Sequence, residues 1–412
     1  EIVENNFHAP KWDILSFYPP GRQTEPFQGW PYTIAILYKI LSSFTMISLT
    51  KVAILSPLIM VALIPIPAFF LGRILSNNVG GLAVALFAVL TPAFIGVSMA
   101  GYSDSDAPVV FNLFLSILTI FLALNQFKKG WLRFLPFAVL AILSNLFFVF
   151  TWGAGWLPQI FFLVLIPAYF IFKLIETRIH HKKFDLNIIS QEVSPLLTPL
   201  LIIILASNIM GFSLGLGNVF SSFLAGLGFT GLFGALMIIF FTSLLASVGF
   251  ITGLVFFKLR GAIVGGIIGF IIAILILIFG NASEEPLLVN ISVAELQVIN
   301  IFTKSGFWTV GDRIGLAPFL LTLIGLPLLL IYRIFKKEKI SFAEIFLLLW
   351  WFGSFLLISR GVRFSLFFSV AAAISAGYVI ANFSKYVKLS LLNVLLISLI
   401  LWVFNPSDKT IL

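Results

Sequence analysis

Residues 99 to 126 read Met-Ala-Gly-Tyr-Ser-Asp-Ser-Asp-Ala-Pro-Val-Val-Phe-Asn-Leu-Phe-Leu-Ser-Ile-Leu-Thr-Ile-Phe-Leu-Ala-Leu-Asn-Gln, and they decide the fold. No residue from 107 to 126 is charged, and about 20 mostly apolar residues are the length that crosses a bilayer as a helix. The residues before this run hold two carboxylates. We therefore predict a membrane helix over 107 to 126 that begins at a polar loop.

The same alternation of apolar runs and short polar segments continues along the chain of 412 residues, of which 60% are hydrophobic, 10% are charged and none is Cys. A soluble domain has about 45–50% apolar and about 25% charged residues. This composition excludes a soluble enzyme, a disulfide-stapled secreted domain and a disordered chain. We predict an all-α polytopic membrane protein with about 12 spans, over residues 52–75, 79–98, 107–126, 131–150, 153–174, 194–212, 232–257, 261–280, 316–335, 342–358, 364–383 and 389–404.

Charge is distributed unequally between the two faces that these spans define. One face receives 16 of the 25 Lys and Arg residues but five of the 16 acids, a net of +11, and the other receives nine basic and eleven acidic residues, a net of −2. The positive-inside rule makes the first face cytoplasmic and places residues 1–50 and the C-terminus outside. The pI near 9.7 is thereby explained by topology, and we expect no nucleic-acid partner because the cytoplasmic loops are too short to form a basic surface.

Polar residues on the predicted external side gather in residues 1–30, 99–108 and 281–315. Ion-coupled transporters usually place carboxylates and broken helices near the midplane of the membrane instead. We therefore predict a site at the outer membrane surface.

Asp104 and Asp106 are separated by one residue, so both carboxylates can reach one hard cation, and Gly101 allows the chain to bend before them. Oxygen ligands favour Mg²⁺ or Mn²⁺ over zinc. The alternative is that these two residues cap the following helix, with Pro108 in its first turn. The short pattern alone favours capping.

Two further external stretches carry charge. A loop as long as 281–315 is uncommon unless it is functional or disordered, and a solvated connector is its alternative. Arg360 and Arg363 lie outside against the positive-inside trend. A guanidinium can hold a phosphate or pyrophosphate through two hydrogen bonds, whereas snorkelling toward lipid headgroups is the alternative.

Aromatic and turn-forming residues fill the N-terminal stretch, in Trp12-Asp13, Phe17-Tyr-Pro-Pro-Gly-Arg22 and Gln28-Gly-Trp-Pro-Tyr32. Pro and Gly give stiff turns, and Trp and Tyr favour the level of the headgroups. We predict an ordered external loop with an interfacial helix over residues 1–50.

Taken in order, these pieces resemble the membrane domain of the oligosaccharyltransferase catalytic subunit, of the single-subunit archaeal or bacterial type. The resemblance rests on five motifs in the family's order: Tyr18-Pro-Pro-Gly-Arg22, Ala100-Gly-Tyr-Ser-Asp-Ser-Asp106, Thr151-Trp-Gly-Ala-Gly155, Ser292-Val-Ala-Glu295 and Val362-Arg-Phe. It implies a GT-C type glycosyltransferase transmembrane domain over 51–404, with catalytic loops 99–108 and 281–315. The proline pair and the absence of Cys favour an archaeal source.

The resemblance also implies an activity and its residues. The activity is inverting, metal-dependent transfer of an oligosaccharide from a polyprenyl or dolichyl phosphate or pyrophosphate to asparagine in Asn-x-Ser/Thr sequons. Asp104 and Asp106 would ligate Mn²⁺ or Mg²⁺, Glu295 would complete the metal site and bind the acceptor amide, and Arg363 would hold the donor pyrophosphate. Three residues are candidates for supporting roles: Tyr18, Arg22 and Arg360. The expected partners are the lipid-linked donor, an acceptor polypeptide and the bilayer, with the active site on the external face of the plasma membrane.

Three departures from the family accompany the resemblance. The family has a further first helix and a further acidic motif, which we expect upstream of Glu1, and a soluble external domain, whose start we expect at 405–412. Val97 stands where the family usually has an arginine. The alternatives are another GT-C transferase, of the O-mannosyl or lipid A type, and a transporter or flippase for a lipid-linked sugar.

Overall fold

The computed structural model describes residues 2–14, 19–24, 28–181, 186–214, 231–279, 299–336, 338–359 and 361–387. The expected roles of Tyr18, Glu295 and Arg360, and the predicted span 389–404, lie outside these residues.

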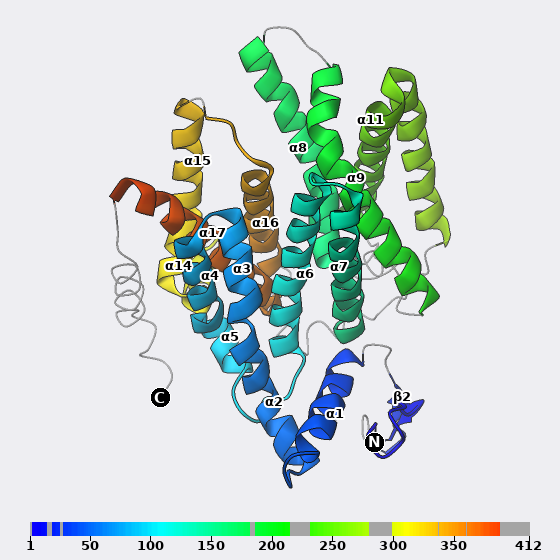
Figure 1. Cartoon of the computed structure of the whole chain (residues 1–412), viewed down its shortest axis with the longest axis vertical. Coiled ribbons are helices and arrows are strands. Elements are labelled where there is room, and N and C mark those ends of the chain that lie inside the picture. Colours follow the sequence, from blue (N-terminus) through cyan, green and yellow to red (C-terminus); the bar gives the residue numbers. More distant parts are fainter. Residues whose placement is uncertain are drawn as a thin grey trace.

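The described part is a bundle of helices with one two-stranded antiparallel hairpin near the N-terminus (Figure 1). The elements, in chain order, are β1 (Trp12–Asp13), β2 (Arg22–Gln23), α1 (Gly29–Ser42), α2 (Leu49–Leu63), α3 (Pro65–Leu75), α4 (Asn78–Leu90), α5 (Pro92–Val97), α6 (Asp106–Phe127), α7 (Trp131–Thr151), α8 (Leu157–His181), α9 (Leu186–Ser213), α11 (Gly231–Phe279), α13 (Lys304–Ile314), α14 (Leu316–Leu320), the π-helical η2 (Leu321–Gly325), α15 (Leu326–Phe335), α16 (Phe342–Ile358), the 3-10 turn η3 (Val362–Phe364) and α17 (Ser365–Val387).

Seven helical stretches of the described part are long and apolar enough to cross a membrane: Leu49–Leu75, Asp106–Phe127, Trp131–Thr151, Leu157–Thr177, Gln191–Ser213, Leu316–Phe335 and Val362–Ser384. Four shorter apolar helices accompany them: Asn78–Leu90, Thr242–Lys258, Gly261–Ile274 and Phe342–Ile358. They coincide with predicted spans, so the all-α polytopic membrane fold is confirmed. The total of about 12 spans stays a prediction.

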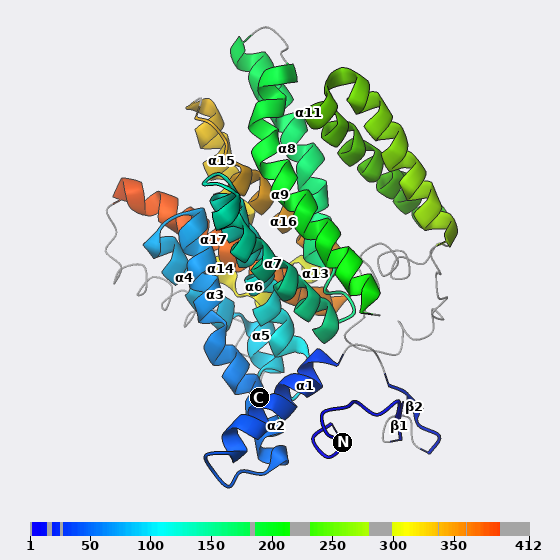
Figure 2. The same ribbon diagram turned by 45° about the vertical axis from the view of Figure 1, so that its right-hand side comes forward.

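Two of the predicted spans, 232–257 and 261–280, form the two arms of α11. Lys258 has a φ of 61° and turns the chain between them. Figure 2 shows the arms side by side at the edge of the bundle. The two arms lie so close together that a Cβ on Gly249 or Gly253 would clash with the backbone of the other arm.

The helices α6 and α17 occupy the centre of the bundle, and most of their side chains are buried in protein. Small residues permit this position, because membrane helices without bulky side chains at the contact can bring their backbones together. On α17 a run of alanines, Ala371 to Ala373, is fully buried. A Cβ on Gly377 would lie 2.9 Å from the carbonyl oxygen of Gly80 on α4.

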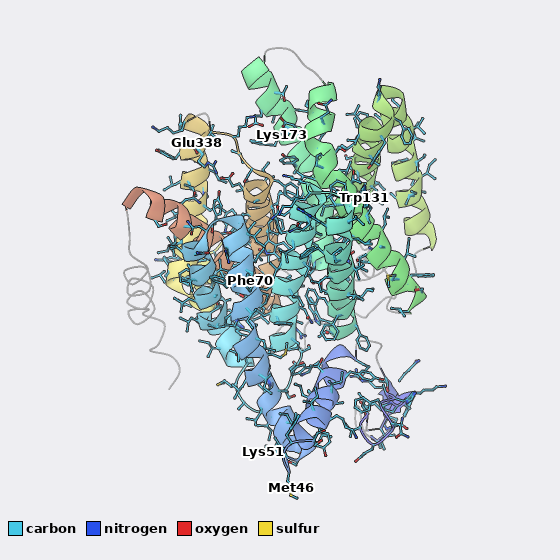
Figure 3. All side chains as sticks on the ribbon, viewed as in Figure 1. Met46, Lys51, Phe70, Trp131, Lys173 and Glu338 are labelled. Carbon is cyan, nitrogen blue, oxygen red and sulfur yellow. The ribbon has the colours of Figure 1, made fainter. Side chains whose placement is uncertain are left out.

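The two ends of the bundle differ in character. Met46 and Lys51 lie at one end and Lys173 and Glu338 at the other (Figure 3). We call the first the Asp104 end, because the loop that carries Asp104 joins α5 to α6 there.

An ion pair to a buried carboxylate ties helices together at the other end. Arg333 of α15 pairs with Glu344 of α16, and the Tyr378 hydroxyl of α17 donates to the same carboxylate at 2.7 Å. Glu344 also closes a capping box with Ser341 at the start of α16. The helices α15, α16 and α17 are thereby joined at the end distant from Arg363, which lies in the turn between α16 and α17.

Candidate functional site

An ion pair joins the first residue of α6 to the turn that opens α17. Arg363 Nη2 lies 3.2 Å from Asp106 Oδ1, across 257 residues of sequence. The Asp106 side chain is 3% exposed and that of Arg363 is 28% exposed. Arg363 therefore contacts a buried carboxylate, which snorkelling toward headgroups does not predict.

Trp152 lies beneath the same guanidinium. The Arg363 Cζ atom lies 5.9 Å from the centroid of the Trp152 ring, and that ring in turn lies 5.0 Å from the ring of Phe367 on α17. Trp152 directly follows α7, in a turn where a Cβ on Gly155 would meet the backbone of Phe148 at 2.6 Å. An aromatic face stabilises a cation above it and holds a guanidinium in one orientation. Three of the motifs found in the sequence thus meet at one point.

Asp104 lies on the loop before α6 and is exposed. Its Oδ1 accepts the backbone N–H of Ser105 at 2.6 Å. The residue that caps α6 is Ser105, whose side chain makes no capping hydrogen bond, while Asp106 is the acid of the first turn. The capping alternative therefore fits Asp106 in part, through the helix dipole, and does not fit Asp104. Gly101 has a φ of 93°, as the predicted bend requires.

Arg22 lies apart from these groups. It forms a pair with Asp13 in the register of the β1–β2 hairpin and is exposed. In Figures 1 and 2 this hairpin lies beyond α1, away from the start of α6. A supporting role for Arg22 stays a prediction.

A model of the family "Oligosaccharyl transferase STT3, N-terminal" matches residues 1–405. The chain belongs to this family. Among curated relatives, the rice dolichyl-diphosphooligosaccharide–protein glycosyltransferase subunit STT3B is 25% identical over 170 residues, which are 40% of this chain and 22% of the relative. The Methanococcus voltae dolichyl-phosphooligosaccharide-protein glycotransferase is 25% identical over 164 residues, 39% of this chain and 18% of the relative.

The fold is that of a solved oligosaccharyltransferase from Archaeoglobus fulgidus. The apo form superposes with a TM-score of 0.64 and 19% identity, over 99% of this chain and 50% of that one. A form tethered to an acceptor peptide gives a TM-score of 0.66 and 20% identity, over 97% and 48% of the two chains. The chain therefore spans about half the length of this STT3-type enzyme.

A hard divalent cation such as Mg²⁺ or Mn²⁺ prefers oxygen ligands, and this STT3-family chain offers two carboxylates at the Asp104 end. Asp104 presents an exposed carboxylate, and Asp106 presents a second one two residues later. Within the described residues, no group of three or more His, Asp or Glu side chains is close enough to hold a metal ion. The donors present fit part of the ligand set that a hard cation needs, and the third predicted ligand, Glu295, lies outside those residues.

Sequence reasoning gave no role to Trp152 and left Arg313 as one charge of the loop 281–315. Residues 304–314 of that loop form the helix α13, and Arg313 Nε donates to Ser365 Oγ at 3.3 Å, two residues from Arg363. For Trp152 the sequence signal was a tryptophan between small residues, and for Arg313 it was a basic residue followed by an apolar span. Neither signal predicts which residue the side chain contacts.

Proposed function

We propose that this chain carries the membrane-embedded half of an oligosaccharyltransferase active site. The reaction is transfer of an oligosaccharide from a polyprenyl or dolichyl phosphate or pyrophosphate to asparagine in Asn-x-Ser/Thr sequons. The observation that carries the proposal is the Arg363–Asp106 pair over Trp152, because it brings three family motifs together at the start of α6 and α17.

On the donor side, Arg363 binds the phosphate groups. A guanidinium has five N–H donors, so the bond to Asp106 is compatible with a further contact to phosphate oxygens. Asp106 and the Trp152 ring hold the guanidinium in place before the donor arrives. The Archaeoglobus fulgidus enzyme has been solved with an inhibitory peptide and a dolichol-phosphate, which supports a phosphate-linked lipid as the donor here.

On the acceptor side, the difficulty is the asparagine amide, whose nitrogen lone pair is delocalised into the carbonyl group. The carboxylate of Glu295 accepts hydrogen bonds from the amide N–H groups and positions the nitrogen toward the anomeric carbon. The new C–N bond forms as the C–O bond to phosphate breaks, the departing phosphate takes the electron pair of that bond, and the nitrogen releases one proton to a neighbouring carboxylate. One displacement therefore inverts the anomeric centre. The Archaeoglobus fulgidus enzyme has also been solved tethered to an acceptor peptide with an NVT sequon.

Asp104, Asp106 and Glu295 are the residues that would hold a divalent cation. When bound, the cation supplies positive charge that stabilises the departing phosphate. Their oxygen atoms favour Mn²⁺ or Mg²⁺. The Archaeoglobus fulgidus enzyme has been solved in complex with Zn and sulfate, which supports a divalent site but not the choice of metal.

The charge distribution supports the location. The Asp104 end belongs to the acid-rich face, so the positive-inside rule places the site on the external side of the plasma membrane. There the headgroup of a lipid-linked donor emerges beside the helices, and an acceptor polypeptide can approach from outside. The bilayer thus confines donor and site to one plane, which favours their encounter.

The test is loss of sequon glycosylation after neutralisation of the proposed metal-binding and acceptor-binding carboxylates. In the intact protein, Asp104→Ala and Glu295→Gln should each abolish cation-dependent transfer to an Asn-x-Ser/Thr peptide. Asp312→Asn, which changes an exposed acid of α13, is the matched control and should keep transfer near the wild-type rate. Wild-type transfer by both site variants would refute the proposal and favour the transporter alternative, which does not require these carboxylates.

A further inference from the structure

The motif Gln28-Gly-Trp-Pro-Tyr32 has no part in the proposed chemistry, yet it lies at the edge of the site. It opens α1, and Trp30 is 4% exposed. The Trp30 indole Nε1 donates to the backbone carbonyl oxygen of Ser103 at 3.4 Å. Ser103 immediately precedes Asp104. The indole is thus buried in the protein and contacts the acidic loop.

A second hydrogen bond fixes the same loop on its other side. The Gly101 N–H donates to the carbonyl oxygen of Ile54 on α2 at 3.0 Å. Gly101 reaches this position with a φ of 93°, which L side chains rarely adopt. The loop that carries Asp104 is therefore tied through its backbone to both α1 and α2.

The first turn of α1 also contacts the part of the site that holds Arg363. A Cβ on Gly29 would lie 2.5 Å from Thr151 Oγ1 and 2.8 Å from Thr151 Cα, so only glycine permits this approach. Thr151 precedes Trp152, the ring beneath Arg363, and its hydroxyl accepts from Asn112 Nδ2 of α6 at 3.3 Å. Two consecutive residues, Gly29 and Trp30, thus touch the Trp152 side and the Asp104 side of the site.

We infer that the Gly29–Trp30 turn sets the position of Asp104 relative to the Arg363–Asp106 pair. Trp30 is a positioning residue: it contacts the loop backbone and acts through Asp104. This inference rests on the proposed function for its consequence, because a displaced Asp104 then holds a cation less well. The tie between Trp30 and the loop does not depend on that function and can be measured without it.

The first measurement needs no turnover. The chain has no Cys, so a single Ser103→Cys can carry a spin label on the exposed side of the loop while its backbone carbonyl still accepts from Trp30. Trp30→Phe keeps an aromatic ring and removes the N–H donor, and it should make the label more mobile. Trp131→Phe, at the far end of α7 with 59% exposure, is the matched control and should leave the label unchanged.

The second measurement separates positioning from general stability. In Trp30→Phe the half-saturating Mn²⁺ concentration for transfer should rise about 5-fold, as expected for the loss of one neutral hydrogen bond. The KM for the donor should stay constant, because Arg363 and Asp106 are unchanged. Gly29→Ala should increase label mobility with Trp30 intact, whereas Gly96→Ala, where a Cβ would meet nothing within 4 Å, should not.

An unchanged label in both Trp30→Phe and Gly29→Ala would overturn the inference. The inference would also be overturned if the label became mobile in Trp30→Phe while the half-saturating Mn²⁺ concentration and the KM for the donor rose by the same factor. This result would indicate a general loosening of the fold. Absence of cation-dependent transfer in the wild-type protein would instead refute the proposed function, and the label would still decide whether Trp30 holds the loop.

Discussion

At the scale of the residue, the guanidinium of Arg363 has two fixed neighbours. Asp106 supplies a charged acceptor at 3.2 Å and Trp152 supplies an aromatic face. An ammonium group at this position would keep the charge but lose the planar fork that matches phosphate. The planar shape of the guanidinium, as well as its positive charge, should therefore determine donor binding.

Arg363→Lys tests this reasoning. Loss of charged hydrogen bonds worth about 1.5–3 kcal/mol should raise the half-saturating donor concentration by roughly 10- to 100-fold. Titration of the lipid-linked donor at saturating acceptor peptide measures the change. Arg133→Lys is the matched control, because Arg133 lies near the N-terminal end of α7, opposite the end that leads to Trp152. It should leave the half-saturating donor concentration as in the wild type. An unchanged value in Arg363→Lys would support snorkelling as the role of this arginine.

Individual residues show how far the sequence alone leads. Asp106 and Arg363 could be placed on the same face from charge alone, and the family motifs assigned their chemistry. Their contact could not be predicted, since it depends on how α6 and α17 pack across 257 residues. The hydrogen bond from Trp30 to Ser103 was missed for a related reason: its acceptor is a backbone carbonyl, which every residue has, so the residue type does not indicate the contact.

At the scale of the element, α17 has a part in two distant clusters. Arg363 lies at the turn that opens it, and Tyr378 contacts Glu344 near its other end. Between them, Gly377 packs against α4 so closely that a Cβ would clash with Val84 and lie 2.9 Å from the Gly80 carbonyl oxygen. The position of Arg363 therefore depends on a contact far from the site.

Gly377→Ala should separate α4 from α17 and lower the free energy of unfolding by about 1–3 kcal/mol, the usual cost of overpacking. Thermal unfolding in detergent measures the loss. The matched control is Gly266→Ala on α11, where a Cβ would meet its nearest neighbour, Phe250, at 3.5 Å and fit without strain. Equal unfolding temperatures for the two variants would contradict this account of the α4–α17 contact.

Hydropathy located the helices better than their interruptions. One predicted span, 79–98, is divided in the structure, because α4 ends at Leu90 and α5 begins at Pro92. The lack of an N–H on Pro92 was a usable sign of this break. By contrast, the π-helical η2 inside the predicted span 316–335 follows from packing and has no comparable sign in its composition.

At the scale of the whole molecule, the distribution of charge predicts which end faces outward. The Asp104 end should be external and the end with Lys173 and Glu338 cytoplasmic. Apolar composition predicted the membrane fold, and sorting charges by face predicted the sidedness. Composition does not predict which helices lie at the centre, since α6 and α17 are apolar like their neighbours and differ in how many of their side chains are buried.

Single cysteines test the orientation, because the chain has none of its own. Ser103→Cys should react with an impermeant thiol reagent in intact cells, and so should Val293→Cys in the predicted external loop. Lys336→Cys, directly after α15 on the predicted cytoplasmic side, should react with the reagent only after the membrane is permeabilised. The reverse pattern would overturn the topology and with it the external active site.

The separation of Asp106 from Arg363 also has a consequence for how the protein is made. Ribosomes add about 5–20 residues per second, so the 257 residues between the two partners take roughly 13–50 s to synthesise. When Asp106 at the start of α6 has been synthesised, its partner Arg363 has not yet been translated. If Arg363 binds the donor phosphate as proposed, a nascent chain lacks the complete phosphate-binding group until Arg363 has been translated, and it should not use donor lipids before then.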